Sequence, residues 1–284
     1  MDTWRTLSAD GNTVTLKRFN DLDLKPLTTD EVAGTELQTG CALDVETTGV
    51  DRSTDSVIEI GLQVFYFHPK TGEIVGKGES ISQFQDPGRP LSGFITQLTG
   101  IQTSDVQGQN IDWVAVSKHL TSAQLIVAHN AGFDRGFIDR YAQYPAVPVW
   151  ACSLKHVGWM NYGFTSASLP MLAAYHGFFS NAHRALVDAQ MVVHLLAQNR
   201  SYVTELYENA HRPRVFVKLS NTPYESRMIL RENGYRWNPP TKTWSKSIAK
   251  EELTESLERL PDIYQGYEPQ YEAREISPTE NFKS

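Results

Sequence analysis

A chain of 284 residues with 40% hydrophobic residues can form one medium-sized domain and a smaller one, each with a core. No apolar run approaches the roughly 20 residues of a membrane span, and residues 1–10 lack a basic end followed by an apolar block, so we expect a cytoplasmic protein with no membrane partner. Two isolated cysteines, Cys41 and Cys152, indicate reduced core thiols and exclude a disulfide scaffold or zinc site. The net charge of −7 does not by itself indicate a nucleic-acid partner.

Residues 1–37 form an N-terminal extension to which we assign no role. Within it, residues 13–17 can form a short strand, and residues 20–30 are polar and rich in turn formers. The pattern becomes periodic from Cys41 onward. We predict three strands, at 41–46, 57–67 and 74–84. Their connections are too short for helices, which predicts an antiparallel meander.

Two carboxylates, Asp44 and Glu46, interrupt the apolar run of the first predicted strand. Alternate side chains of a strand share a face, so both point the same way. Burying such a pair costs on the order of several kcal/mol unless a positive charge compensates it, and hard oxygen ligands suit Mg²⁺ or Mn²⁺. The Thr47, Thr48 and Gly49 that follow can bring backbone N–H groups close to a ligand. A strand end that reaches water explains the two acids equally well.

The next segments alternate between helix and strand. We expect a helix over 90–101, ended by Gly100, with Phe94 and Leu98 on one face. A helix at 111–120 and a strand at 125–128 follow, and His129, Asn130 and Asp134 come directly after that strand. The remaining predicted elements of this half are a helix at 133–144 and a strand at 147–150. Such alternation indicates an α/β sheet covered on both faces.

The strongest helical pattern of the chain begins after residue 181. Five positions turn an α-helix by roughly 140°, so His183 and Asp188 cannot share one helix face. We therefore expect His183 in the entering loop and Asp188 about one turn inside the helix. In that arrangement both side chains can converge on one point in front of the helix.

A boundary at His211 to Pro213 separates a second, small α+β domain at 212–261. We predict its elements as a strand at 214–219, a helix at 223–233, a hairpin at 235–246 and a helix at 249–260. Residues 262–284 are polar, and we expect a flexible tail.

The small domain has nine Lys or Arg and two Glu between His211 and Lys250, although the whole chain is acidic. Four aromatic residues are interleaved with these cations: Tyr224, Tyr235, Trp237 and Trp244. Basic grooves with stacking aromatic rings are typical of single-strand binding, so the pattern favours a nucleic-acid partner. The alternative is a cross-strand tryptophan pair beside a solvated basic face. Residues 234–244 weakly resemble HARP-like modules.

Three motifs occur in order along the larger domain, 38–205. They are Asp44-x-Glu46-Thr47-Thr48-Gly49, His129-Asn130-x-x-Phe133-Asp134 and His183-Arg184-Ala185-x-x-Asp188. Together they resemble the motifs of the DEDDh, or DnaQ-like, 3′-to-5′ exonucleases, including the epsilon-subunit-like members. The resemblance implies an RNase H-like α/β domain with a mixed five-stranded sheet.

The resemblance also implies roles for the motif residues. The catalytic set would be His183, Asp44, Glu46, Asp134 and Asp188. Two Mg²⁺ or Mn²⁺ ions would be held by the four acids, with Asp44 shared, Glu46 and Asp188 completing the first site and Asp134 supporting the second. His183 would take the proton from the attacking water.

Substrate contacts implied by the family are less specific. They would come from Thr47, Thr48, Gly49, Asn130, Phe94 and Leu98, with Ile101 beside the last two. Core packing of an amphipathic helix explains two of Phe94, Leu98 and Ile101 at least as well. We expect structural roles for His129 and Phe133.

The predicted function is a metal-dependent 3′-to-5′ exonuclease that releases nucleoside monophosphates from DNA. The partner would be a nucleic acid, as single-stranded DNA or a 3′ end, in DNA replication or repair, with a polymerase or repair protein as a further partner. Two alternatives stay open at this point. One is an exoribonuclease of the same superfamily, and the other is a nucleic-acid-binding protein with an inert nuclease core.

Overall fold

The computed structural model describes residues 6–7, 11–143, 147–180 and 183–283. The chain divides into two compact units. Unit 1 comprises residues 1–210 and 282–284, and unit 2 comprises residues 211–281. None of the helices in the described residues combines the length and the apolar composition that crossing a membrane requires.

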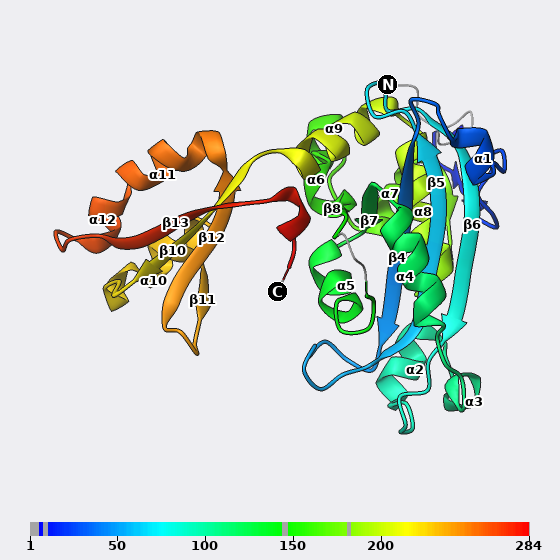
Figure 1. Ribbon diagram of the computed structural model, residues 1–284, viewed down its shortest axis with the longest axis horizontal. Helices are drawn as coiled ribbons and strands as arrows, with labels where there is room; N and C mark the ends of the chain where they lie inside the picture. Colours follow the sequence, from blue (N-terminus) through cyan, green and yellow to red (C-terminus); the bar gives the residue numbers. More distant parts are fainter. Residues whose placement is uncertain (1–5, 8–10, 144–146, 181–182, 284) are drawn as a thin grey trace. The chain divides into compact units, whose positions relative to one another are not determined.

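A five-stranded mixed sheet forms the centre of unit 1 (Figure 1). Its strands, in spatial order, are β6 (Ile74–Phe84), β5 (Val57–Phe67), β4 (Gln38–Thr47), β7 (Leu125–Ala128) and β8 (Val149–Cys152). Neighbours β6, β5 and β4 are antiparallel, whereas β7 and β8 run parallel to β4. The expected antiparallel meander and the RNase H-like fold are thereby confirmed.

Helices cover both faces of this sheet, as the alternation of the sequence predicts. The helical elements are α2 (Gly93–Thr99), α3 (Thr103–Val106), α4 (Trp113–Ser122), α5 (Ala131–Ile138), α6 (Ser153–His156), η1 (Trp159–Tyr162), α7 (Leu169–Tyr175), α8 (Ala185–Ala197) and α9 (Arg200–His211). On one face, α7, α8 and α9 share a core with Phe65 and Phe67. On the other face, α4 and α5 share a core with Leu62 and Val64. Alternate residues of β5 therefore serve different cores, which is why the whole strand is buried.

The N-terminal extension adds short elements at the side of unit 1. They are β1 (Thr6–Leu7), β2 (Val14–Thr15), β3 (Lys17–Arg18) and α1 (Thr29–Val32). β1 and β2 pair with each other, and β3 pairs in parallel with β9 (Phe178–Phe179). The strand expected at 13–17 is thus divided between two short strands.

Two predicted boundaries near the second motif were wrong. The helix expected at 133–144 is α5, which begins at Ala131 and ends at Ile138. After Ile138 the chain continues in turns, and the side chain of Arg140 donates to the carbonyl oxygens of Arg52 and Asp55 at 2.7 and 2.6 Å. Residue 144 lies outside the described residues. The strand expected at 147–150 begins at Val149, after a proline that has no N–H to donate to the ladder.

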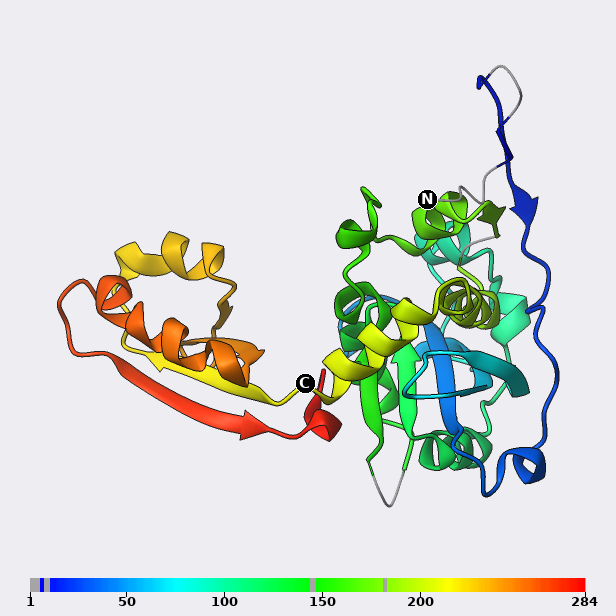
Figure 2. The ribbon, with the colours of Figure 1, turned by 90° about the horizontal axis from the view of Figure 1, so that it is seen from above.

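Unit 2 is a four-stranded antiparallel sheet with helices on one face (Figure 2). Its spatial order is β11 (Arg236–Asn238), β12 (Thr243–Ala249), β10 (Arg214–Ser220) and β13 (Gln270–Ile276). Its helical elements are η2 (Tyr224–Ser226), α10 (Arg227–Glu232), η3 (Lys250–Glu252), α11 (Leu253–Glu258), α12 (Leu260–Tyr264) and η4 (Pro278–Glu280). Val215, Val217 and Leu219 of β10 pack against residues of α10, α11 and α12.

The flexible tail expected at 262–284 is a wrong prediction. Residues 270–276 form β13, which pairs with β10 along its whole length. Most of this strand is exposed, so backbone pairing and not apolar burial holds it in place. Its sequence consequently has no apolar alternation from which a strand can be predicted.

The basic character expected of residues 212–261 does not describe the folded unit. Across residues 211–281, eleven Lys and Arg balance eleven Asp and Glu. Acids that follow Lys250 in the sequence form ion pairs with cations at or before it. The pairs are Arg212 with Glu251, Lys218 with Glu272 and Lys250 with Glu275. The excess of positive charge in the sequence is therefore largely neutralised within unit 2.

Candidate active site

Strand β4 and helix α8 bring three carboxylates together in unit 1. Oxygen atoms of Asp44, Glu46 and Asp188 all lie within 4.8 Å of one another. Asp44 and Glu46 point to the same side of β4, as their spacing predicts. Glu46 and Asp188 are each only 9% exposed, so the cluster is largely removed from solvent.

A glycine on β5 allows α8 to lie directly on the sheet beside this cluster. Gly61 is the register partner of Asp44. A Cβ atom at Gly61 would lie 1.9 Å from the backbone nitrogen of Leu186, a distance that no side chain tolerates. Only glycine therefore permits the approach of α8 that carries Asp188 to Asp44.

We expect Gly61→Ala to displace α8 from the sheet. The overpacking should lower the free energy of unfolding by about 1–3 kcal/mol. Because misplacement of a reacting group by about 1 Å can cost about 100-fold in rate, nuclease activity should fall by that order. Gly93→Ala is the matched control, since a Cβ there meets no atom within 4 Å. Denaturant unfolding and hydrolysis rates measure both effects, and unchanged values for Gly61→Ala would contradict this account of the packing.

Asp134 lies in the first turn of α5. It lines a cavity of about 490 Å³ that is also lined by Asp44, Glu46 and Asp188. It is 1% exposed, and its Oδ1 accepts a hydrogen bond from the backbone N–H of Val45 at 3.3 Å. Its Oδ2 is buried and has no hydrogen-bond partner. Asp134 is outside the group of three mutually close carboxylates, but an unpartnered buried carboxylate oxygen is suited to a cation.

The four acids cannot all be ionised without a compensating positive charge. Burial is the main cause that raises the pKa of each, to about 8 for Glu46, about 7 for Asp134 and about 6 for Asp188. The pKa of Asp44 lies well above its usual value, first because of burial and then because of the charges of Asp134 and Asp188. The donor set thus has the chemistry of a divalent cation site.

His183 occupies the loop directly before α8, as predicted from helix geometry. Its backbone has a left-handed φ of 67°, and its N–H donates to Oδ2 of Asp188 at 2.9 Å. This hydrogen bond partly offsets the rise in the pKa of Asp188. The imidazole is exposed and lines the same cavity as the acids.

Glu59 and Arg184 form a contact that the sequence analysis missed. Glu59 is 1% exposed and stands opposite Glu46 in the ladder. Its carboxylate accepts from Nε and Nη2 of Arg184 at 3.2 and 3.1 Å and from the backbone N–H of Ala185 at 3.2 Å. The pair therefore holds the first turn of α8, and with it the loop that presents His183.

A cavity of about 490 Å³ connects these groups. It is lined by Asp44, Val45, Glu46, His129, Phe133, Asp134, Leu154, Ala167, Ser168, Leu169, Pro170, His183 and Asp188. The sequence analysis left residues 154–170 without a role. The sequence Ser168-Leu169-Pro170 is typical of a helix start, since proline is favoured in the first turn. It predicts the beginning of α7, whose first residues line the cavity.

His129 is a structural residue, as expected. Its Nε2 donates to the carbonyl oxygen of Ala167 and its Nδ1 accepts from the hydroxyl of Ser153, both at 2.9 Å. Burial lowers the pKa of His129 to about 4, so the ring is neutral near pH 7. Phe133 is half-buried, pairs with Phe137 and also lines the cavity.

The six residues expected to contact substrate are not among those that line the cavity. Phe94 and Leu98 are 71% and 42% exposed on α2, whereas Ile101 is buried, so the core interpretation holds for Ile101 alone. Asn130 has a left-handed φ of 84° and starts α5 without a side-chain cap. Whether these residues contact substrate stays a prediction.

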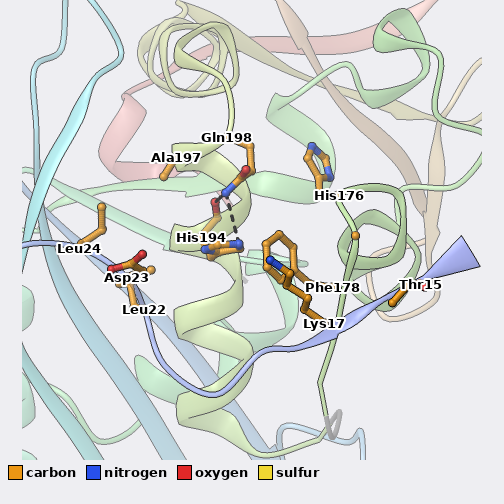
Figure 3. A pocket seen from close by; sticks show the side chains of 11 residues that line it. Thr15, Lys17, Leu22, Asp23, Leu24, His176, Phe178, His194, Ala197 and Gln198 are labelled. Carbon is orange, nitrogen blue, oxygen red and sulfur yellow. Dashed lines mark hydrogen bonds between the residues drawn. The ribbon is translucent and has the colours of Figure 1, made fainter. Parts of the chain in front are cut away.

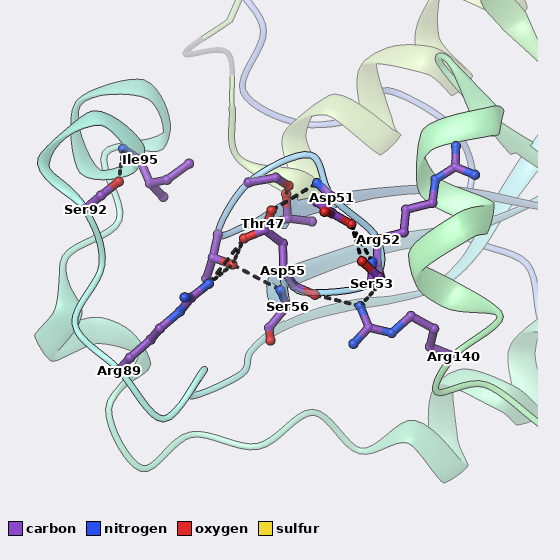
Figure 4. Close-up of polar contacts among 12 residues, drawn as sticks. Thr47, Asp51, Arg52, Ser53, Asp55, Ser56, Arg89, Ser92, Ile95 and Arg140 are labelled. Carbon is purple, nitrogen blue, oxygen red and sulfur yellow. Dashed lines mark hydrogen bonds and ion pairs between the residues drawn. The ribbon is translucent and has the colours of Figure 1, made fainter. Parts of the chain in front are cut away.

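Thr48 belongs to a polar network around the loop after β4. Figure 4 shows two of its partners, Asp55 and Arg89. The Thr48 hydroxyl donates to Oδ1 of Asp55 at 2.9 Å and accepts from Nη2 of Arg89 at 3.1 Å. Thr47 donates to the carbonyl oxygen of Gly49. The side-chain hydroxyls are thus engaged within the loop, and so is the backbone N–H of Thr48, which donates to the carbonyl oxygen of Ser56 at 2.9 Å.

A second cavity, of about 480 Å³, lies between the N-terminal segment and α7, β9 and α8 (Figure 3). Lys17, His176, Phe178 and His194 are among its lining residues. His176 is already paired with the carbonyl oxygen of Leu172 and the hydroxyl of Tyr202. The four acids are not part of this cavity.

Comparison with known families gives one match over most of the site-bearing domain. A family model described as "Exonuclease", RNase_T, matches residues 41–196. A DNA polymerase III PolC-type protein of Listeria welshimeri is 42% identical over 113 residues, which are 39% of this chain and 7% of that protein. A PolC-type protein of Latilactobacillus sakei is 30% identical over 176 residues, which are 58% of this chain and 11% of that protein. The chain therefore spans only a small part of the length of these relatives.

Two solved structures are similar in part. Exonuclease X in complex with 5′ overhanging duplex DNA is 22% identical with a TM-score of 0.44, covering 59% of this chain and 99% of that chain. A zinc-bound E. coli ExoI–ssDNA complex is 17% identical with a TM-score of 0.49, covering 85% of this chain and 63% of that chain.

Proposed function

This chain belongs to the DnaQ-like 3′-to-5′ exonuclease family, and from that premise we propose that it hydrolyses DNA from the 3′ end and releases nucleoside monophosphates. One observation carries the proposal. Asp44, Glu46 and Asp188 converge at one cavity that also contains Asp134 and His183. A complete donor set beside a titratable side chain is what phosphodiester hydrolysis requires.

We assign the four acids as the residues that would hold two Mg²⁺ or Mn²⁺ ions, and Asp44 would serve both. Glu46 and Asp188 would complete the first site, and the unpartnered Oδ2 of Asp134 fits the second. When bound, such ions offset the negative charge of the acids and of the scissile phosphate and lower the pKa of water.

His183 is assigned as the general base. Its exposed ring stands at the mouth of the cavity, and its backbone is tied to Asp188. The water oxygen attacks phosphorus and its proton passes to the imidazole. The bond between phosphorus and the 3′ oxygen breaks, and the leaving oxygen takes a proton from solvent to become the 3′ hydroxyl. Histidine suits this transfer because a neutral imidazole has a ring nitrogen that can accept a proton.

DNA is preferred over RNA as the proposed substrate because the relatives named above are DNA polymerases. RNA as the substrate is the second candidate, since the five motif residues serve either sugar. The intact set of five residues argues against an inert core. A cytoplasmic location and a polymerase or repair partner stay predictions.

Product analysis tests the proposal directly. A single strand labelled at its 3′ end should lose its label as a mononucleotide in the first turnover, whereas a 5′-labelled strand should shorten progressively. Release of the 5′ label as a mononucleotide in the first turnover would contradict the polarity. Tight binding with no product from either strand would favour the binding-protein alternative.

Removing metal should make stability depend on pH. The pKa values of Glu46 and Asp134 in the folded state, about 8 and about 7, lie above their ordinary values of 4.5 and 3.8. At a pH between the ordinary value and the raised value of each group, the folded state therefore binds more protons than the unfolded state. The free energy of unfolding should therefore fall as pH rises from about 4 to about 8. Thermal melts in EDTA should show this loss, and Mg²⁺ should raise the Tm more at about pH 8 than at about pH 6. An equal Mg²⁺ effect at both pH values would contradict the assignment of these acids to the ions.

A further inference from the structure

The face of the unit 2 sheet opposite its helices has a regular pattern of side chains. Along β10, Val215, Val217 and Leu219 belong to the core under the helices, so Phe216 and Lys218 project from the other face. Figure 2 shows the described helices of unit 2 on one side of this sheet. We name the other side the open face.

Register places an aromatic ring at the centre of the open face. Phe216 is the partner of Ser247 on β12 and of Arg274 on β13. Two residues away along β10, on the same face, lie Arg214 and Lys218. Phe216 is half-buried and is not part of the apolar core of unit 2. An aromatic ring that the core does not use is thus surrounded by three cationic side chains.

The neighbouring row extends this pattern to the edge of the sheet. Arg236 of β11 is the register partner of Ser245 on β12, and Ser245 is the partner of Lys218 on β10. Lys218 is in turn the partner of Glu272 on β13. Arg236 is exposed. The open face therefore has four cations, at 214, 218, 236 and 274, and one acid within its strands, Glu272. Lys218 pairs with Glu272 at 2.8 Å, and Arg274 pairs with Glu280 of η4 at 2.9 Å, so a phosphate would have to compete with these two acids. Of the acids of η3, Glu251 pairs with Arg212, and the charge of Glu252 acts on Arg214.

Two of the four aromatic residues singled out in the sequence are buried, whereas Tyr224 is 73% exposed on η2 with Arg227 over its ring. Tyr235 and Trp244 are 3% and 6% exposed and belong to the core, and Lys246 lies 4.5 Å from the ring of Tyr235. Trp237 is the partner of Trp244 across the hairpin, with ring centroids 5.4 Å apart. The cross-strand interpretation of this pair is confirmed. Because the two tryptophan rings pack on each other, we consider Phe216 on the open face as the ring that stacks on a base.

We propose that the open face binds single-stranded nucleic acid, with a base stacked on Phe216 and phosphates held by Arg236, Lys218, Arg214 and Arg274. The choice of nucleic acid as the ligand rests on the proposed function of unit 1. The charge of the face complements a phosphate backbone, and a flat ring accepts any base. Ser245 and Ser247 add hydroxyl groups that can bond to phosphate or sugar.

The test uses the full chain in EDTA, so that binding is measured without hydrolysis. Anisotropy of labelled oligothymidylate and oligouridylate of about 20 nucleotides reports the Kd and distinguishes DNA from RNA. Phe216→Ala should weaken binding of one or both strands by about fivefold or more. Arg236→Ala should weaken binding and reduce the slope of log K against log salt by about one. Arg231→Ala is the matched control, because it removes one exposed cation from α10 on the other side of the sheet.

Several outcomes would overturn the proposal. One is an equal affinity of the wild type, Phe216→Ala and Arg236→Ala for the strand. Another is a loss of affinity in Arg231→Ala as large as in Arg236→Ala. Both results indicate that binding does not use the open face specifically. Displacement of the strand by poly-glutamate as readily as by unlabelled DNA, without an effect of Phe216→Ala, would indicate an acidic protein as the partner. Circular dichroism shows whether each variant folds, and Arg236→Ala, at an exposed position of the edge strand, keeps the test available if Phe216→Ala does not fold.

Failure of this inference and failure of the proposed function give different results. Hydrolysis by the wild type with unchanged binding in both open-face variants would leave the exonuclease assignment standing and remove the open face. Weaker binding in those variants, together with no hydrolysis by the wild type, would support the open face and contradict the exonuclease assignment.

Discussion

Replacement of Asp44 by Asn should abolish hydrolysis without weakening the fold. Asp44 is placed at the centre of the acid cluster, and the amide cannot supply the negative charge that a shared cation site needs. We expect a loss of about 1000-fold or more in kcat. In the absence of metal the raised pKa of Asp44 favours its neutral form, which Asn resembles in shape and charge. The Tm in EDTA should accordingly be no lower than that of the wild type.

The control for Asp44→Asn is the response to metal. Mg²⁺ should raise the Tm of the wild type and have a much smaller effect on the variant. A variant that retains both hydrolysis and the Mg²⁺-dependent rise in Tm would remove Asp44 from the metal site. Asp105→Asn is a matched substitution on α3, outside the acid cluster and the cavity, and it should leave rate and metal response unchanged.

Replacement of His183 by Asn should lower the rate while the acid cluster stays intact. Asn tolerates the left-handed φ of 67° better than most residues, and the hydrogen bond to Asp188 comes from the backbone N–H, which Asn retains. Loss of a general base typically costs about 100- to 10,000-fold in rate. The Mg²⁺-dependent rise in Tm should be unchanged, which distinguishes this variant from Asp44→Asn. A wild-type rate in His183→Asn would exclude His183 as the base.

Conservative replacement of the missed ion pair gives a smaller expected effect. Glu59→Gln removes the charge that Arg184 faces but can still accept the N–H of Ala185. We expect hydrolysis to fall about tenfold with little change in the Kd for substrate, because the first turn of α8 loses orientation, not a substrate contact. Rates and Kd values measured in parallel test this, and a pure loss of affinity would contradict a positioning role.

The sequence predicted the parts of the fold that depend on local pattern. Strands β5, β6 and β7 have the predicted bounds because alternating or continuous apolar runs end at turn residues. The placement of His183 before α8 and Asp188 inside it followed from the rotation of a helix alone. Features that local geometry decides were accessible without a structure.

Features that depend on distant partners were not accessible. Glu59 and Arg184 are 125 positions apart, and a single acid in a buried strand does not reveal its partner. The neutral charge of unit 2 depends on acids that follow the stretch in which its cations were counted. The open face required knowledge of which side of β10 the helices cover. In each case the missing information was a tertiary contact.

The most direct test of the central claim is a time course on matched 5′-labelled single-stranded DNA and RNA. The reaction contains Mg²⁺ or Mn²⁺, with EDTA and Asp44→Asn as controls. We predict a ladder that shortens from the 3′ end, that runs faster on DNA, and that is absent in EDTA and in the variant. Cleavage that persists in Asp44→Asn, or the absence of cleavage of both strands with either metal, would contradict the assignment of this acid cluster as an exonuclease site.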